Sequence, residues 1–420
     1  MAFWRRFRAR EDEGAAPSCT ALDVGTEFAK ALVFEVAEDG TGVVRGVGRQ
    51  RQGLSHMQSG TVADIDAVVD NCALALQEAE AMAGFRPSQV VIGIAGELVK
   101  GFTTSHALER RHPNTPITEQ ELQRLIDGVQ HEALLEAERA ITWETGLPNV
   151  DVQLVHAAVR GAQIDGYNVT NPIGFQGRHI RIGIFNAFAP LVHVGALRTV
   201  ASRLDLELLA VVAEPYAVAR CLGSEESALA GALFMDVGGG TTDVALVRQG
   251  GIEGTRMFAL GGRAFTKSLA DHLGLPFARA EDLKVDFSRG LAVDDAAQVE
   301  RIIGEDITVW AAGVELVLEE LAAGDLLPGR IHLCGGGSRL PHIQRVLADP
   351  AFAARLPFAR PPEIKVIDPA EVVAIHDGTH LLVDQADVTP MGLAFQAIEM
   401  ASTESPLDTA LRRVLRRMGV

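Results

Sequence analysis

Two segments of the chain place an aspartate, glycine and threonine together after an apolar run. They are Asp23–Lys30 and Asp236–Asp243. Backbone N–H groups bind a polyphosphate at close range, which favours glycine, while hydroxyls and a carboxylate suit a magnesium ion. Because each segment carries this set, the pair predicts a site for a magnesium-bound polyphosphate.

The residue types suggest separate roles within this site. Asp23 and Asp236 each precede Val-Gly, where two carboxylates can orient Mg²⁺ through its waters. Lys30 can place its ammonium near the β- and γ-phosphates. The residues expected to surround the phosphates are Gly25, Thr26, Gly238, Gly239, Gly240, Thr241 and Thr242. Either segment alone is equally well explained as a tight β-turn.

A third glycine-rich loop follows another apolar run. Gly335, Gly336, Gly337 and Ser338 come after a predicted strand at 330–333, and Pro341 is suited to begin a helix. Such a loop lets an adenosine lie against the peptide backbone. Alone it is more often a flexible turn, but with the other two loops it indicates ATP.

The elements around these loops follow an α/β pattern that occurs twice. Residues 20–36 and 232–247 both predict a β-hairpin with the acidic, glycine-containing turn in the middle. Helices are expected at 62–84, 189–204 and 298–323, with strands at 90–95 and 208–212. The repeat suggests two similar domains that face one cleft.

Bulk properties exclude several classes of protein. The 420 residues, 47% hydrophobic and 22% charged, can bury the cores of two or more domains. A net charge of −17 disfavours binding to nucleic acid. The four cysteines show no CxxC spacing, so we interpret them as packing residues in a reducing cytoplasm. The composition predicts neither a membrane span nor an export signal.

Both ends of the chain are basic and are candidates for contact with an anionic membrane. After Pro406, apolar residues recur at the helical interval over 407–420, with arginines mostly on the other face. The residues expected to bind the membrane are Leu407, Leu411, Arg412, Val414, Leu415, Arg416 and Met418. Residues 1–8 combine aromatics with arginine. A helix docked on the protein body and a disordered arm are the alternatives.

In chain order, the three loops reproduce the phosphate-one, phosphate-two and adenosine motifs of the actin, heat-shock-chaperone and hexokinase superfamily. Within it the chain most closely resembles the FtsA family of bacterial cell-division proteins, over roughly residues 19–400. Further similar segments are 46–48, 60–65, 90–96, 117–122, 171–174 and 213–217. The resemblance implies an actin-like, ribonuclease H-like two-domain α/β ATPase fold with an inserted α+β subdomain of the SHS2 type.

The resemblance also implies roles for four more side chains. Glu214, with Asp236, lies where the superfamily positions the attacking water, although a glutamate before proline can simply cap a helix. Glu281 and Lys284 resemble residues that contact the ribose, and an exposed ion pair is the alternative. Any enzyme activity would be a slow ATPase at most.

We expect the following organisation: 1–18, basic tail and linker; 19–97, first part of the first actin-like domain; 98–186, inserted subdomain; 187–230, return helix and connection; 231–400, second actin-like domain; 401–406, linker; 407–420, basic amphipathic helix.

The expected function is that of an ATP-binding scaffold that polymerises on the cytoplasmic face of the inner membrane and tethers the FtsZ division ring. Its expected partners are further copies of itself, FtsZ and other division proteins, and an anionic membrane. The near alternative is a PilM-like cytoplasmic adaptor for pilus or secretion assembly, which suits Lys30 at least as well. A small-molecule kinase fits less well because no substrate pocket is recognisable. A heat-shock chaperone would need more chain after the third loop.

Overall fold

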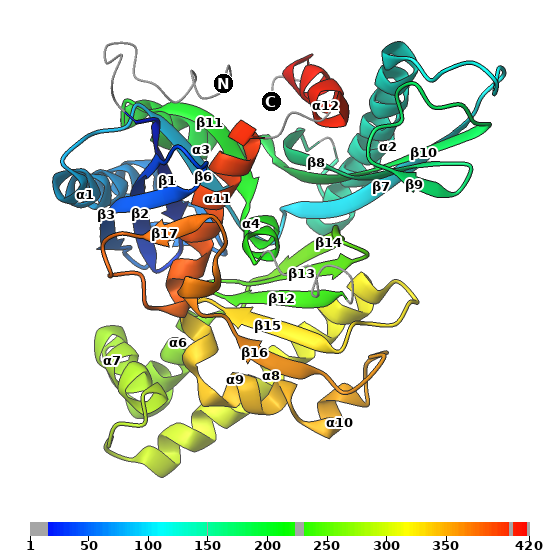
Figure 1. Ribbon diagram of the computed structural model, residues 1–420. Coiled ribbons are helices and arrows are strands. Elements are labelled where there is room, and N and C mark those ends of the chain that lie inside the picture. The colour runs from blue at the N-terminus through cyan, green and yellow to red at the C-terminus, as the bar shows by residue number, and fades with distance from the viewer. Residues whose placement is uncertain (1–15, 149, 223–230, 403–405, 418–420) are drawn as a thin grey trace.

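The computed structural model describes residues 16–148, 150–222, 231–402 and 406–417. The described chain builds two large β-sheets, each with helices packed against it (Figure 1). The predicted α/β architecture is confirmed. The predictions for residues 1–15, 223–230, 403–405 and 418–420 lie outside the described residues.

The first sheet has six strands in the order β11-β6-β1-β2-β3-β17. Their bounds are β11 Glu207–Ala213, β6 Gln89–Ile94, β1 Ser18–Val24, β2 Phe28–Val36, β3 Gly42–Arg51 and β17 Ile375–Asp377. Helices α1 (Ile65–Ala83) and α3 (Leu191–Arg203) contact each other and this sheet, and α4 (Glu214–Cys221) and α11 (Val388–Ser402) form a second contacting pair. This part contains one of the main hydrophobic cores.

The second sheet has nine strands in the order β16-β15-β12-β13-β14-β7-β10-β8-β9. Their bounds are β16 Glu363–Val366, β15 Arg330–Cys334, β12 Ala232–Val237, β13 Thr242–Arg248, β14 Gly251–Phe258, β7 Lys100–Glu109, β10 His179–Pro190, β8 Val152–Ile164 and β9 Tyr167–Val169. The helices in the same part of the chain as β12–β16 are α6 Gly262–Leu273, α7 Phe277–Ser288, α8 Ala296–Ala322, α9 Pro341–Leu347 and α10 Pro350–Ala353. A short pair, β4 (Met57–Gln58) and β5 (Thr61–Val62), lies apart from both sheets.

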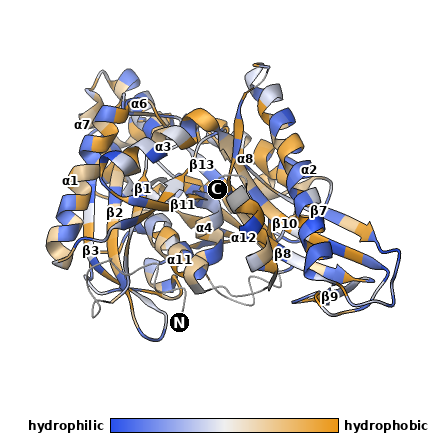
Figure 2. Ribbon diagram, turned by 90° about the horizontal axis from the view of Figure 1, so that it is seen from above, coloured by the Kyte–Doolittle hydropathy of each residue, from blue (hydrophilic) through white to orange (hydrophobic). Residues whose placement is uncertain are grey.

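Local sequence explains where the long helices begin and end. The Asp64 side chain accepts a hydrogen bond from Ala67 N at the start of α1, and Gly84 ends the helix in the left-handed conformation. Thr118 forms a capping box with Glu121 at the start of α2 (Glu119–Thr145). Figure 2 shows hydrophilic and hydrophobic residues interleaved along both helices, as expected where one face packs and the other meets water.

The inserted segment continues the second sheet. β14 pairs with β7 through Gly254↔Phe102 and Thr255↔Gly101, so β7, β10, β8 and β9 extend the sheet that β12–β14 begin. Helix α2 packs against β7 and β10. Strand β10 runs to Pro190, four residues beyond residue 186, where the inserted subdomain was predicted to end.

One predicted domain boundary is wrong, because the chain returns to the first sheet before residue 400. Strand β17 pairs in parallel with β3, and α11 buries Val388, Met391 and Leu393 in the core of the first domain. The second domain therefore ends near β16 rather than at 400. Return contacts between residues about 330 positions apart leave no local sequence signal.

The chain ends, within the described residues, on helix α12 (Pro406–Arg417), which packs against α2 and β8. In the part of the chain that is described, no helix is both long and apolar enough to cross a bilayer.

Candidate functional site

The two hairpin turns and the third glycine loop meet in one pocket of about 600 Å³ between the two domains. Fourteen of the predicted site residues line it: Asp23, Gly25, Thr26, Lys30, Glu214, Asp236, Gly238, Gly239, Thr241, Glu281, Lys284, Gly335, Gly336 and Gly337. Segments predicted separately from the sequence are thus adjacent in the fold.

Strand register explains why these loops converge. Asp23 of β1 is paired with Lys30 of β2, and Asp236 of β12 is paired with Asp243 of β13. β15 lies parallel to β12 with Cys334 opposite Asp236, so the glycine loop after β15 emerges beside the second acidic turn. Parallel neighbours end at the same sheet edge, which is where α/β proteins place their ligands.

The second turn and the third loop also need glycine for close contact. A Cβ at Gly335, whose φ is +81°, would lie 2.0 Å from Asp236 Oδ1, and one at Gly239 would lie 2.9 Å from Glu27 Cβ. Only glycine lets these loops approach the acidic strand end and the opposite turn so closely.

Lys30 has two hydrogen-bond partners within the protein. Its ammonium donates to Asp23 Oδ2 at 2.8 Å and to the carbonyl oxygen of Ala386 at 2.7 Å. Burial opposes the charged form, but the carboxylate of Asp23 leaves the pKa of Lys30 above its ordinary value. Lys30 therefore stays charged and links the first acidic turn to the segment before α11.

Three of the buried carboxyl groups that line the pocket have raised pKa values. Burial raises the pKa values of Glu214 and Asp243 well above their ordinary values, and neighbouring carboxylates add to both shifts. The pKa of Asp236 is also raised, mainly by burial, although Thr389 donates a hydrogen bond to its Oδ2. A bound cation would stabilise the charged forms of these carboxyl groups, so the pocket is suited to receive one.

The donor set suits Mg²⁺ held through water. No group of three or more acidic, histidine or cysteine side chains in the described ranges is arranged to ligate a metal directly. Magnesium binds oxygen, keeps several waters and usually needs only one or two carboxylates when a phosphate supplies other ligands. Asp23 and Asp236 can fill that indirect role.

Three predicted residues do not line the pocket. Thr242 is buried, donates to the Leu260 carbonyl at 2.7 Å and accepts from Trp310 Nε1 at 2.9 Å. Ser338 donates to the Gly335 carbonyl at 2.7 Å. Gly240 instead packs against Thr26. Thr242 and Ser338 thus use their hydroxyls to hold the loops, because neighbouring residues in a strand or turn point in different directions.

Glu281 and Lys284 form a largely buried pair on α7 rather than an exposed one. Lys284 Nζ lies 2.8 Å from Glu281 Oε2 and also donates to the Gly262 carbonyl at 2.9 Å. Thr266 of α6 donates to the same glutamate oxygen. The pair therefore fastens α7 to α6 on one wall of the pocket.

Some pocket residues were not identified from the sequence. Arg263 Nε of α6 donates to Glu27 Oε2 at 2.6 Å, which ties the second domain to the turn of the first. Thr389 reaches Asp236 from α11. Asp243 was recognised only as the end of a segment. Pairings over this many residues follow from the fold and give no motif.

The predicted membrane-binding face is covered in this structure, as in the alternative of a helix docked on the protein body. Leu407, Leu411 and Val414 are buried against the inserted subdomain, and Leu415 is partly buried there. Arg412 donates to the Met400 carbonyl at 2.7 Å. The side chain of Arg416 and the whole of Met418 lie outside the described residues. The apolar stripe of α12 therefore packs against an apolar surface of the protein itself, in place of a membrane.

Comparison with known proteins supports the family resemblance that the motifs indicate. Residues 233–375 match the family model described as "Cell division protein FtsA". The chain is 26% identical to the cell division protein FtsA of Pseudomonas aeruginosa over 347 residues, which is 76% of this chain and 77% of that protein. It is 25% identical to FtsA of Bacillus subtilis over 385 residues, covering 84% of this chain and 81% of that protein. The predicted resemblance to FtsA is confirmed.

Solved structures show the fold. The PilM–PilN type IV pilus biogenesis complex aligns with a TM-score of 0.62 at 18% identity, covering 90% of this chain and 98% of that chain. MreB5 of Spiroplasma citri bound to ADP aligns with a TM-score of 0.50 at 15% identity, covering 91% and 97%. The predicted actin-like fold is confirmed, and likenesses at this identity carry no conclusion about role.

Proposed function

We propose that this chain, a relative of the FtsA cell-division proteins with an actin-like fold, is an ATP-binding scaffold of the division machinery at the inner membrane. One observation carries the proposal: three loops from distant parts of the chain line a single pocket of about 600 Å³. The sequence similarity to FtsA connects that pocket to cell division.

The loops supply what a nucleotide needs. In this proposal, backbone N–H groups of the turns after Asp23 and Asp236 hold the phosphates, and the loop at Gly335–Gly337 supports the adenosine. Glu281 and Lys284 line the wall where a ribose would lie. When bound, Mg²⁺ would neutralise charge on the phosphates.

Hydrolysis is proposed to be slow at most. Glu214 lines the pocket and is 7% exposed, so it can orient a water molecule. The raised pKa of Glu214 favours its protonated form before a cation arrives, and a protonated carboxyl cannot accept a proton from water. Assembly rather than turnover would then be the main output of ATP binding.

Membrane attachment is assigned to the basic C-terminal helix, with the N-terminal basic segment as a second contact. Self-association, FtsZ and other division proteins are the proposed partners. Attachment through α12 requires its apolar side chains to leave the protein body, since Leu407 and Leu411 are buried there. Each arginine near an anionic surface would add on the order of 1 kcal/mol to binding.

The test is co-sedimentation of the full chain with anionic liposomes, with and without MgATP. Arg413→Glu is the diagnostic variant, and Arg301→Glu is its matched control. Both arginines form ion pairs in the structure, and both side chains are 56% exposed. We expect full-length protein and the control to pellet, and Arg413→Glu to lose at least half of the bound fraction.

Two results would contradict the proposal. Equal pelleting by both variants would remove α12 as the anchor, and a chain that stays in the supernatant under all conditions would favour a soluble, PilM-like adaptor. Nucleotide binding is measured separately with a fluorescent ATP analogue. No saturable binding at millimolar MgATP would refute the assignment of the pocket.

A further inference from the structure

Helix α12 is docked on the body of the protein. Leu407, Ala410, Leu411 and Val414 belong to the same hydrophobic cluster as residues of α2 and β8. Arg413 forms an ion pair with Glu119 at the start of α2. The surface that the proposed function assigns to the membrane is therefore satisfied within the molecule.

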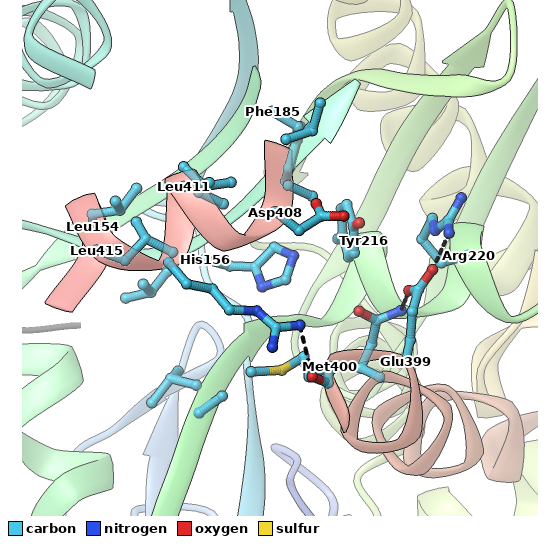
Figure 3. Close-up of a pocket in the computed structure, with 18 of the residues that line it drawn as sticks. Leu154, His156, Phe185, Tyr216, Arg220, Glu399, Met400, Asp408, Leu411 and Leu415 are labelled. Atoms are coloured by element: carbon cyan, nitrogen blue, oxygen red, sulfur yellow. Dashed lines mark hydrogen bonds and ion pairs between the residues drawn. The ribbon is translucent and has the colours of Figure 1, made fainter. Parts of the chain in front are cut away.

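The packing beside α12 is incomplete. A pocket of about 530 Å³ remains between α12, β8, α4 and α11. Figure 3 shows Leu411 and Asp408 of α12 on one side of this space, with His156 of β8 and Tyr216 of α4 nearby. This pocket is open to solvent, so α12 covers only part of the surface beside it.

Polar groups line the same pocket. His156 is 8% exposed, its ring lies 4.3 Å from the Tyr216 ring, and among the described residues its Nε2 has no hydrogen-bond partner. Arg220 at the end of α4 pairs with Glu399 near the end of α11. Arg412 is held by the carbonyl oxygen of Met400, the next residue along α11. The end of α11 therefore holds α12 directly.

The opposite end of α11 lies at the nucleotide pocket. Thr389, in its first turn, donates to Asp236, and Lys30 donates to the Ala386 carbonyl just before it. Helix α4 also begins at the nucleotide pocket, with Glu214, and its last two residues are Arg220 and Cys221.

Helices α4 and α11 pack closely against each other. A Cβ at Gly392 of α11 would lie 3.0 Å from the Ala217 carbonyl of α4, so their backbones touch. Backbone contact without intervening side chains leaves little freedom for one helix to shift alone.

We infer that α12 is a latch. In the docked position it covers its own membrane-binding face, and occupation of the nucleotide pocket releases it. This inference rests on the proposed function. Phosphate and Mg²⁺ would compete for Asp236 and Lys30, which hold the start of α11 through Thr389 and Ala386. Loss of those contacts lets α11 and α4 shift and weakens the hold on Arg412. A ligand moves such an equilibrium only through different affinity for the two states.

The first measurement is hydrogen–deuterium exchange of the amides of 407–417 in the full chain, without lipid, with and without a non-hydrolysable MgATP analogue. We expect the analogue to accelerate exchange in this segment at least about threefold, which corresponds to about 0.7 kcal/mol by the same logarithmic relation that makes tenfold about 1.4 kcal/mol. Binding of the analogue is measured on the same sample.

Two body-side variants separate docking from coupling without altering α12. Ala157 of β8 is half-buried against the clusters that contain Leu411 and Leu415, so Ala157→Glu places a carboxylate beneath the docked helix. Ala73→Glu adds the same charge on an exposed position of α1 and is the control. We expect Ala157→Glu to pellet with anionic liposomes more than its control without nucleotide, although the added negative charge would by itself oppose binding.

Arg220→Met tests the coupling, because it removes the pair with Glu399 at the far end of α4. We expect the analogue to bind this variant while its effect on exchange in 407–417 falls by at least half. If the analogue binds but never changes that exchange, or Ala157→Glu pellets no better than Ala73→Glu, the latch is refuted and the proposed function stands. If the analogue does not bind, or no variant binds lipid, the latch and the proposed function both fail.

Discussion

The buried carboxyl group of Asp243 lowers the free energy of unfolding of the nucleotide-free protein at neutral pH, and Asp243→Asn should show by how much. The side chain is 3% exposed, and its Oδ1 has no hydrogen-bond partner among the described residues. Its one hydrogen bond, from Thr241 Oγ1 to Oδ2, is long at 3.4 Å. Burial and the nearby carboxylate of Asp236 raise the pKa of Asp243 well above 3.8. Asparagine keeps the shape and removes the charge.

The sign follows from proton binding. Below pH about 4 the carboxyl is protonated in both the native and the unfolded chain, so it adds no pH dependence. As the pH rises above the ordinary pKa of 3.8, the unfolded chain loses the proton first and the native chain keeps it. The free energy of unfolding therefore falls by up to about 1.4 kcal/mol per pH unit until the native pKa is passed.

Urea unfolding without nucleotide, at intervals between about pH 5 and about pH 8, measures this slope. Asp243→Asn should flatten the decline by up to about 1.4 kcal/mol per pH unit and should be more stable than the unmodified chain at the alkaline end. Glu214, whose pKa is also raised, should leave a residual decline. Asp70→Asn, on the exposed face of α1, should not alter the slope. Parallel slopes for Asp243→Asn and the unmodified chain would refute the reasoning.

Two glycine pairs give further predictions from close contacts. Gly48→Ala would place a Cβ 1.7 Å from the Ala75 carbonyl and should lower the free energy of unfolding by about 3 kcal/mol or more, while Gly161→Ala meets nothing within 4 Å and should stabilise by about 0.5 kcal/mol; urea unfolding distinguishes the signs. Gly335→Ala would push a Cβ to 2.0 Å from Asp236 Oδ1 and should weaken binding of a fluorescent ATP analogue at least about tenfold, whereas Gly304→Ala, in α8 away from the pocket and with nothing within 4 Å, should change affinity less than about threefold. Equal effects within either pair would contradict the contact argument.

Local patterns were sufficient for the elements and for most of the pocket. Apolar runs that end in Asp-Val-Gly predicted the β1–β2 and β12–β13 hairpins, which pair as antiparallel strands. Hairpins form between sequence neighbours, so their turn residues are readable without knowledge of the rest of the fold. The alternation of strands and helices likewise predicted the α/β class.

The direction of individual side chains was not readable at the same level. Thr241, just before β13, lines the pocket, and Thr242, the first residue of β13, does not, because successive residues of extended backbone face opposite sides. Whether a hydroxyl meets a ligand or holds a loop depends on which side the partner strand and Trp310 occupy. That choice belongs to the packed structure.

By itself, the sequence determined the fold class, the three loops and the amphipathic character of the C-terminal helix, because each depends on residues close together in the chain. Tertiary structure alone decided that β17 and α11 return to the first sheet, that Thr389 reaches Asp236, and that the apolar side of α12 packs on the body. These outcomes depend on which distant surfaces become neighbours. A helix stripe shows that an apolar partner is needed, and only the folded chain shows which partner is present.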